Sequence, residues 1–151
     1  MAKIIIREIE YDDLKRGFLK VLESLVLPDL DQYSAKKILS EIKSNNLHKI
    51  FVAIDESNND LVVGTITLFI EPKFINKGMR IAYIEDVSVR ENYQRLGIGS
   101  ELVSFATKNA ISEEDCKKVI LYCAKQTVSF YRKLGYKVED DIFVMKFEAS
   151  T

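Results

Sequence analysis

Hydrophobic and polar residues alternate along this chain in short blocks, and the spacing within each block predicts its secondary structure. Apolar residues recur every three or four positions from Asp12 to Leu25, which predicts an amphipathic helix that ends before Pro28. A second helix is expected from about Ser34 to Asn45. Ile50 to Ile54 and Leu61 to Ile70 are apolar runs joined by a polar turn of hairpin length. These two runs therefore predict a pair of antiparallel strands.

The second half of the chain continues this alternation. The other expected elements are strands at Lys3 to Glu8, Arg80 to Val89 and Lys118 to Cys123, helices at Ser100 to Ala110 and Val128 to Leu134, the second of them ended by Gly135, and closing strands at Tyr136 to Glu139 and Phe143 to Phe147. This order predicts an α/β fold with a mixed, mostly antiparallel sheet, flanking helices and one β-α-β crossover. Each connecting loop is short, so we expect one domain over residues 1–151.

Composition narrows the classes of function. The chain has 151 residues, of which 47% are hydrophobic, enough to form a core without disulfides or metal. Its net charge is −1 with acids and bases interspersed, which argues against nucleic-acid binding. Two cysteines and one histidine do not form a zinc-ligand pattern. We find no apolar run of signal-peptide or membrane-span length, so we expect a reduced, metal-free, cytoplasmic protein that does not bind membranes.

A glycine-containing turn, Gln94 to Gly99, lies between a predicted strand and a predicted helix. Two glycines spaced by one residue allow a tight turn in which backbone N–H groups converge at the positive end of the helix dipole. The pattern is neither Gly-x-Gly-x-x-Gly nor a Walker motif. The turn therefore predicts a site for a phosphate or diphosphate.

The pattern Gln-x-x-Gly-x-Gly between strand and helix resembles the pyrophosphate loop of the GNAT superfamily of acetyl-coenzyme A-dependent N-acetyltransferases. Four other segments resemble the glucosamine 6-phosphate N-acetyltransferases within it: Leu14 to Leu22, Ile70 to Ile75, Ile84 to Val87 and Val128 to Tyr136. The resemblance implies the GNAT fold and a homodimer. It also implies direct transfer of acetyl from acetyl-CoA to the 2-amine of D-glucosamine 6-phosphate in a ternary complex, a step of UDP-N-acetylglucosamine biosynthesis.

The same resemblance implies the residues that contact acetyl-CoA. They are Val87, Ser88, Val89, Gln94, Arg95, Leu96, Gly97, Ile98, Gly99, Ser100, Thr127 and Tyr131. Tyr131 is also the candidate general acid, since a phenol can hydrogen-bond or protonate the thiolate that leaves. Without the resemblance, Tyr131 is interpreted as a core tyrosine at helical spacing from Val128 and Leu134.

The residues implied to bind the amino sugar are Lys73, Phe74, Glu85, Asp86, Lys118 and Tyr122, with Glu85 also catalytic. Adjacent carboxylates on a strand point to opposite faces unless a bulge intervenes. Burial of either one is costly, so at least one is expected to line a polar site, and a strand-edge ion pair is the alternative. Lys73 and Lys118 would hold the sugar phosphate, partly from a second subunit, and solvated surface lysines are the alternative.

Three positions depart from the family pattern. Tyr122 stands where the family has an acid that orients or deprotonates the amine, Thr127 where it has an asparagine, and Glu148 near a C-terminal arginine. A backbone carbonyl or a water relay with Glu85 is the expected substitute for the acid. Cys123 has no histidine near it in sequence, so an acetyl-cysteine intermediate is rejected, and His48 is interpreted as a strand-edge residue.

Two other functions stay open. The first is an acetyltransferase whose acceptor is another amine, such as a protein N-terminus, a lysine or a polyamine. The lysine pair Lys73 and Lys118 favours an anionic acceptor instead. In the second, the chain is a non-catalytic module that binds acyl-CoA, and the position of Tyr131 argues against it.

Overall fold

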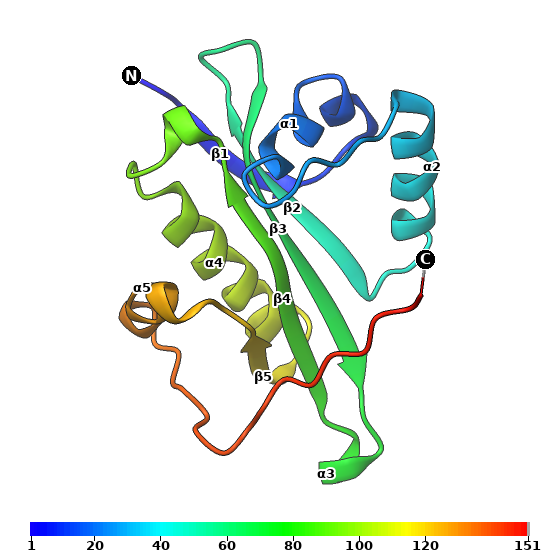
Figure 1. The fold of residues 1–151 in the computed structure, drawn as a ribbon, viewed down its shortest axis with the longest axis vertical. Helices are drawn as coiled ribbons and strands as arrows, with labels where there is room; N and C mark the ends of the chain where they lie inside the picture. The colour runs from blue at the N-terminus through cyan, green and yellow to red at the C-terminus, as the bar shows by residue number, and fades with distance from the viewer. Residues whose placement is uncertain (151) are drawn as a thin grey trace.

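The computed structural model describes residues 1–150, and its centre is a five-stranded sheet in the order β1-β2-β3-β4-β5 (Figure 1). The strands are β1 (Ile4–Glu8), β2 (His48–Asp55), β3 (Leu61–Pro72), β4 (Arg80–Val89) and β5 (Cys116–Leu121). The first four strands pair antiparallel, and β5 lies parallel to β4. The predicted α/β fold with a mostly antiparallel sheet and one β-α-β crossover is therefore confirmed.

The helical segments lie between these strands and on both sides of the sheet. They are η1 (Tyr11–Leu14), α1 (Phe18–Leu22), α2 (Gln32–Lys43), α3 (Ile75–Gly78), η2 (Glu91–Tyr93), α4 (Ile98–Lys108), the π-helical turn η3 (Asn109–Glu113), η4 (Lys125–Thr127) and α5 (Val128–Lys133). The predicted bounds of β4 match the observed ones, and most other boundaries differ by a few residues. No helix within residues 1–150 is both long enough and apolar enough to cross a membrane.

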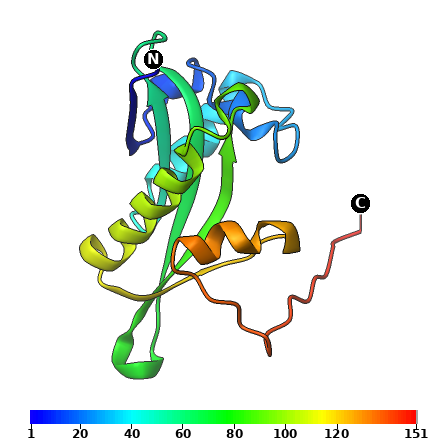
Figure 2. The ribbon, with the colours of Figure 1, turned by 90° about the vertical axis from the view of Figure 1, so that its left-hand side faces the viewer.

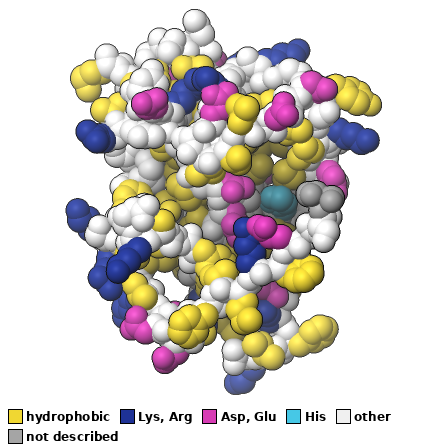
Figure 3. All heavy atoms as spheres, viewed as in Figure 1, with side chains coloured by type: hydrophobic (Ala, Val, Ile, Leu, Met, Phe, Trp, Pro, Cys, Tyr) yellow, Lys and Arg dark blue, Asp and Glu magenta, His cyan; other side chains and the backbone are white. Residues whose placement is uncertain are grey.

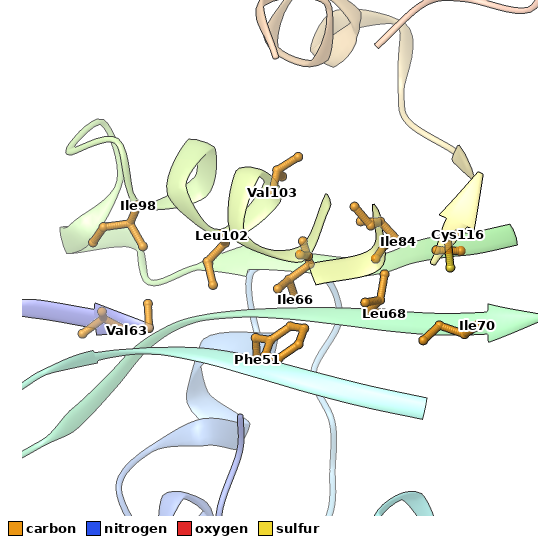
Figure 4. Packing of buried hydrophobic residues seen from close by; sticks show 14 of the residues in the cluster. Phe51, Val63, Ile66, Leu68, Ile70, Ile84, Ile98, Leu102, Val103 and Cys116 are labelled. Atoms are coloured by element: carbon orange, nitrogen blue, oxygen red, sulfur yellow. The ribbon is translucent and has the colours of Figure 1, made fainter. Parts of the chain in front are cut away.

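Alternating side chains of the strands build a hydrophobic core on each face of the sheet. Figure 2 shows helices on both sides of the sheet. In β2, Phe51 and Ala53 pack with α4, whereas Ile50 and Val52 pack with α1 and α2, as expected from the two-residue period of a strand. Figure 4 shows the α4 side, where Leu102 lies over the strands. The sheet is thus held between two hydrophobic cores.

The helix predicted from Asp12 to Leu25 is wrong in its extent. The chain instead forms η1, a left-handed residue at Gly17 with φ +93°, and then the short helix α1. A residue with positive φ cannot continue a right-handed helix, so the apolar periodicity is carried across two separate segments.

The closing strands predicted at Tyr136 to Glu139 and Phe143 to Phe147 are also wrong, because the described chain after α5 contains no strand. A strand needs a hydrogen-bonded neighbour, and this segment meets none among residues 1–150. The apolar side chains of its second half stay exposed, from 66% at Ile142 to 96% at Phe147. The segment crosses in front of β4 in Figure 1 but lies clear of the sheet in Figure 2.

Candidate active site

The central feature of the site is a gap between β4 and β5. β5 pairs with β4 only from Arg80 to Ile84, and the ladder ends there. On its other edge, β4 stays paired with β3 as far as Val89. Apart from the Val89 carbonyl, which accepts from Gln94 Nε2, the backbone N–H and C=O groups on the free edge of residues 85–89 are therefore open to pair with an extended ligand.

The glycine turn closes one end of this gap. Arg95 and Gly97 adopt left-handed conformations, with φ +64° and +84°, and α4 begins at Ile98. No side chain of residues 1–150 caps this end of α4. The first N–H groups of the helix therefore remain available to bind an anion, as the sequence predicts.

A β-bulge sets the position of the two carboxylates. Thr65 pairs with Ser88 and Thr67 with Glu85, so the register between β3 and β4 shifts at this point, and Asp86 has φ +50°. Both carboxylates are exposed. The expected side-chain alternation is thus interrupted by a bulge, and Asp86 faces the side of the sheet that Thr67 faces.

Asp86 lies at the edge of a groove of about 240 Å³ between the sheet and the segments around α1 and α2. Phe18, Leu22 and Ile38 supply apolar walls, and Thr67 and His48 add polar groups. Figure 3 shows this face of the molecule, with acidic and hydrophobic side chains beside the histidine. The bulge therefore lies beside a groove with both apolar and polar walls.

Paired residues on the same face of the sheet form rows that lead away from the bulge. Glu71, Ile81 and Lys118 make up one row across β3, β4 and β5, since cross-strand partners share a face. Lys73 donates to Glu71 Oε1 at 2.7 Å, at one end of this row. Lys118 stands two strands from Glu71, a separation of about 10 Å. The two predicted lysines therefore share one level of the sheet but are not in contact.

A second row contains Phe69, Tyr83 and Ile120. Hydrogen bonding to Glu71 raises the pKa of Tyr83, and the same contact helps to lower the pKa of Glu71. Tyr122 follows the end of β5 and is 61% exposed. The aromatic side chains of Phe69 and Tyr122 thus lie near Tyr83, which contacts the carboxylate of Glu71.

Tyr131 lies on α5, beyond the gap. Burial raises the pKa of its phenol, and the nearby Cys123 raises it further. Its ring packs edge-on against Phe130 and Tyr136. A raised pKa keeps the phenol protonated at neutral pH, so Tyr131 has a proton to donate.

Side chains of three predicted cofactor residues already bind within the protein. Ser88 Oγ donates to Val21 O at 2.6 Å, Gln94 Nε2 to Val89 O at 3.0 Å, and Thr127 Oγ1 to Ala124 O at 2.8 Å. These side chains stabilise the site locally. In particular, Ser88 has only its backbone left to offer a ligand.

The other predicted residues differ in their exposure to solvent. Leu96 and Phe74 are exposed, whereas Ile98 is buried and can contribute only its N–H group. A Cβ at Gly99 would meet Phe130 at an ordinary 3.6 Å, so this glycine is not required by internal packing. No group of three or more His, Cys, Asp and Glu side chains suited to a metal ion occurs among residues 1–150.

Sequence reasoning missed Glu71, Tyr83 and Arg90. Glu71 stands two residues before Lys73, a spacing that signals an ion pair when both residues end a strand. Arg90 follows β4 and binds carbonyls far away in sequence, for which the sequence gives no local signal.

Comparison with known proteins agrees with this geometry. Residues 11–136 match the profile of the Acetyltransferase (GNAT) family. The chain is 46% identical over 136 residues to glucosamine 6-phosphate N-acetyltransferase from Candida albicans, covering 87% of each chain. It is 29% identical over 131 residues to the Arabidopsis thaliana enzyme of that name, covering 86% of this chain and 87% of the relative.

A solved structure of glucosamine-6-phosphate N-acetyltransferase from Arabidopsis thaliana superimposes with a TM-score of 0.88 at 27% identity. The match covers 97% of this chain and 99% of that one. The predicted GNAT fold is confirmed. The chain belongs to the Acetyltransferase (GNAT) family, among the glucosamine 6-phosphate N-acetyltransferases.

Proposed function

We propose that this chain transfers the acetyl group of acetyl-CoA to the 2-amine of D-glucosamine 6-phosphate, giving N-acetylglucosamine 6-phosphate. One observation carries the proposal. The free edge of β4 runs from two carboxylates at a bulge to the unpaired N–H groups at the start of α4. Such an arrangement suits a long ligand with a diphosphate at one end and a reactive carbonyl near the carboxylates.

In this proposal the cofactor arm pairs with the backbone of Val87 to Val89. The diphosphate binds N–H groups from Gly97 to Ser100, and the Arg95 side chain, which is exposed, adds a positive charge. The carbonyl of Val89 accepts from Gln94, which supports the turn at the end of the strand. Acetyl-CoA supplies the acetyl group as a thioester, whose bond to sulfur is replaced by a bond to the amine nitrogen.

Tyr131 is proposed to donate a hydrogen bond or its proton to the departing sulfur. The phenol is protonated at neutral pH, so its O–H can hydrogen-bond to the sulfur as negative charge develops there. The exposed thiol of Cys123 lies close to Tyr131, but no step of the proposal uses it.

Glu85 and Asp86 are proposed to orient the sugar and receive the proton of the amine, directly or through water. An α-amino group has a pKa of about 8, so a fraction of such an amine is already neutral at pH 7. A strong base at the place of Tyr122 is therefore not required. No metal ion takes part in the proposed reaction.

The sugar phosphate is proposed to bind near Lys73 and Lys118, with Phe74 and Tyr122 beside it. Both lysines lie at one level of the sheet, at the row of Glu71, one row beyond Tyr83. Glu85 and Tyr83 point to the same face. An acceptor with an amine at one end and a phosphate at the other would lie along this face.

We also infer a homodimer that is formed by the C-terminal segment. Its side chains Ile142, Phe143, Val144, Met145 and Phe147 are exposed, and so are Phe69 and Tyr122 on the sheet face. The outer edge of β5 has no neighbouring strand among residues 1–150. A second copy of the chain could cover both surfaces.

Sedimentation of the chain cut after Gly135, beside the full chain, tests this inference. The full chain is expected to be a dimer and the shortened chain a monomer. The same oligomeric state for both chains would contradict the inference that the C-terminal segment forms the dimer.

We further propose that residues 1–151 form one catalytic domain that acts in the cytoplasm. The match of the family profile to residues 11–136 supports a single domain. Both cysteines carry free thiols, which agrees with a reducing compartment.

Turnover by the unaltered chain tests the main proposal. With acetyl-CoA and glucosamine 6-phosphate, we expect release of free thiol and a product acetylated on the 2-amine. Polyamines and peptides with free N-termini serve as competing acceptors. Acetylation of one of them in place of the sugar would refute the assigned substrate, and binding of acetyl-CoA without any turnover would indicate a non-catalytic module.

A further inference from the structure

Arg90, the first residue after β4, links three parts of the fold. Its backbone N–H donates to Val63 O at 2.8 Å, and its Nε donates to Val62 O at 2.7 Å. Its Nη2 reaches Gly17 O, at the start of α1, at 3.0 Å. One residue therefore joins the start of β3 and the end of β4 to the start of α1.

Ser88 makes a second link to the same helix. Its Oγ donates to Val21 O at 2.6 Å and also contacts the hydroxyl of Ser24, two residues after the end of α1. Ser88 is 4% exposed, so these bonds are shielded from water. Buried hydrogen bonds are costly to break, so they fix the position of their partners.

The spacing of the two links matches the geometry of a strand against a helix. Ser88 and Arg90 are two residues apart, and two residues of a strand span about 6.7 Å. Gly17 and Val21 are four residues apart, which in a helix is a rise of about 6 Å. Two neighbouring donors on one face of the β4 end can thus meet two carbonyls on one face of α1.

Gly17 has the shape that this arrangement needs. A Cβ at this position would lie 2.1 Å from Arg90 Nη2, and the residue has φ +93°. A side chain here would both displace the guanidinium and strain the backbone. The glycine that interrupts the predicted helix is therefore also the residue that admits Arg90.

The links connect the two halves of the proposed site. The edge of β4 from Val87 to Val89 is the surface proposed for acetyl-CoA, and Phe18 and Leu22 of α1 line the groove beside Asp86. We infer that Arg90, with Ser88, is a positioning residue that holds the α1 wall of the acceptor groove against the cofactor strand. The identity of the acceptor rests on the proposed function, whereas the link itself does not.

Kinetics of Arg90→Met test the inference at a temperature at which the variant stays folded. The KM for the amino sugar is expected to rise about fivefold, equivalent to about 1 kcal/mol, with the KM for acetyl-CoA changed less than twofold. Arg90→Lys keeps one donor group, so its KM for the amino sugar is expected to lie between that of the unaltered chain and that of Arg90→Met. Lys20→Met is the matched control, because it removes an exposed positive charge from the same helix without touching the link.

Amide hydrogen exchange gives a readout that does not depend on the acceptor. In Arg90→Met, amides of α1 such as Val21 are expected to exchange faster, and amides of α4 to be unchanged. Equal rises in both KM values, or a lowered unfolding temperature with unchanged KM values and unchanged α1 exchange, would overturn the inference. Failure of the proposed function would instead appear as absent turnover in the unaltered chain, with the exchange difference still present.

Discussion

Lys73 and Glu71 form an ion pair in which the ammonium nitrogen lies 2.7 Å from Oε1 of the carboxylate. Hydrogen bonds from Lys73 and Tyr83 lower the pKa of Glu71, and the bond to Glu71 raises the pKa of Lys73. Both groups are therefore charged at neutral pH. A phosphate that binds Lys73 has to share this cation with Glu71 or displace it.

Glu71→Gln is expected to lower the KM for glucosamine 6-phosphate about twofold, the modest effect typical of an exposed ion pair. Removal of the carboxylate leaves Lys73 free for the phosphate, so the gain should be absent with unphosphorylated glucosamine. Steady-state kinetics with the two sugars measure this difference.

Glu56→Gln is the control for that experiment, because Glu56 pairs with Lys3 at the same 2.7 Å but belongs to no proposed site. A higher KM for the phosphorylated sugar in Glu71→Gln would show that Glu71 itself binds the substrate. Equal changes for both sugars would remove Lys73 from the phosphate site.

Tyr131→Phe is expected to lower kcat about a hundredfold, the lower end of the range for a proton donor, with acetyl-CoA affinity nearly unchanged. Because burial raises the pKa of Tyr131 above its usual 10.0, the unaltered enzyme should lose this contribution only above pH 10. A pH profile of kcat for both proteins measures the effect.

Tyr136→Phe is the matched control, since the Tyr136 hydroxyl contacts Thr107 at 2.6 Å and its ring packs against Tyr131. This variant should retain kcat. If Tyr131→Phe and Tyr136→Phe had the same kcat, Tyr131 would have no specific role in the chemistry.

Gly97→Ala tests the turn at the start of α4. Gly97 has φ +84°, and no atom lies within 4 Å of the place where its Cβ would stand. Alanine therefore strains the backbone by about 1–2 kcal/mol without a clash, and a shift of the turn should weaken acetyl-CoA binding at least tenfold.

Gly135 is a control with the same geometry, because it has φ +95° and equally open surroundings at the end of α5. Gly135→Ala should cost similar stability and leave acetyl-CoA affinity within twofold. Calorimetric titration of both variants separates strain from ligand binding. Similar affinities in the two would argue that the turn does not hold the diphosphate.

Asp13→Asn is expected to reduce the free energy of unfolding by about 3 kcal/mol, because it leaves the charge of Arg7 without its partner. The Asp13 side chain is fully buried, and both its oxygens accept from Arg7, at 2.7 and 2.8 Å. Urea unfolding measures the loss. Glu23→Gln, which breaks an exposed pair with Lys20, should change stability little, and a similar small loss in Asp13→Asn would contradict the expected cost.

The sequence predicts those elements whose signals are local. The bounds of β4 follow from a long apolar run between a glycine and a polar turn. The helix after that turn was also predicted, but α4 begins at Ile98, directly after the left-handed Gly97 and two residues before the predicted Ser100. The break at Gly17 was missed because the apolar spacing continues across it, and periodicity does not register a single left-handed residue.

Other features depend on contacts that no local pattern encodes. The segment from Tyr136 to Phe147 has the composition of strands but meets no partner strand in the described part of the chain. Likewise, the direction of Ser88, which turns its hydroxyl to Val21, is decided by tertiary packing. The candidate site residues were predicted largely through family resemblance, whereas the bulge that brings Glu85 and Asp86 to one side could be inferred only as an alternative.

A crystal structure with coenzyme A and glucosamine 6-phosphate bound tests the central claim most directly. We predict the diphosphate within hydrogen-bond distance of N–H groups between Gly97 and Ser100, the arm paired with the backbone of Val87 to Val89, and the sugar amine beside Glu85 or Asp86. A diphosphate bound elsewhere, with these N–H groups facing solvent, would contradict the account.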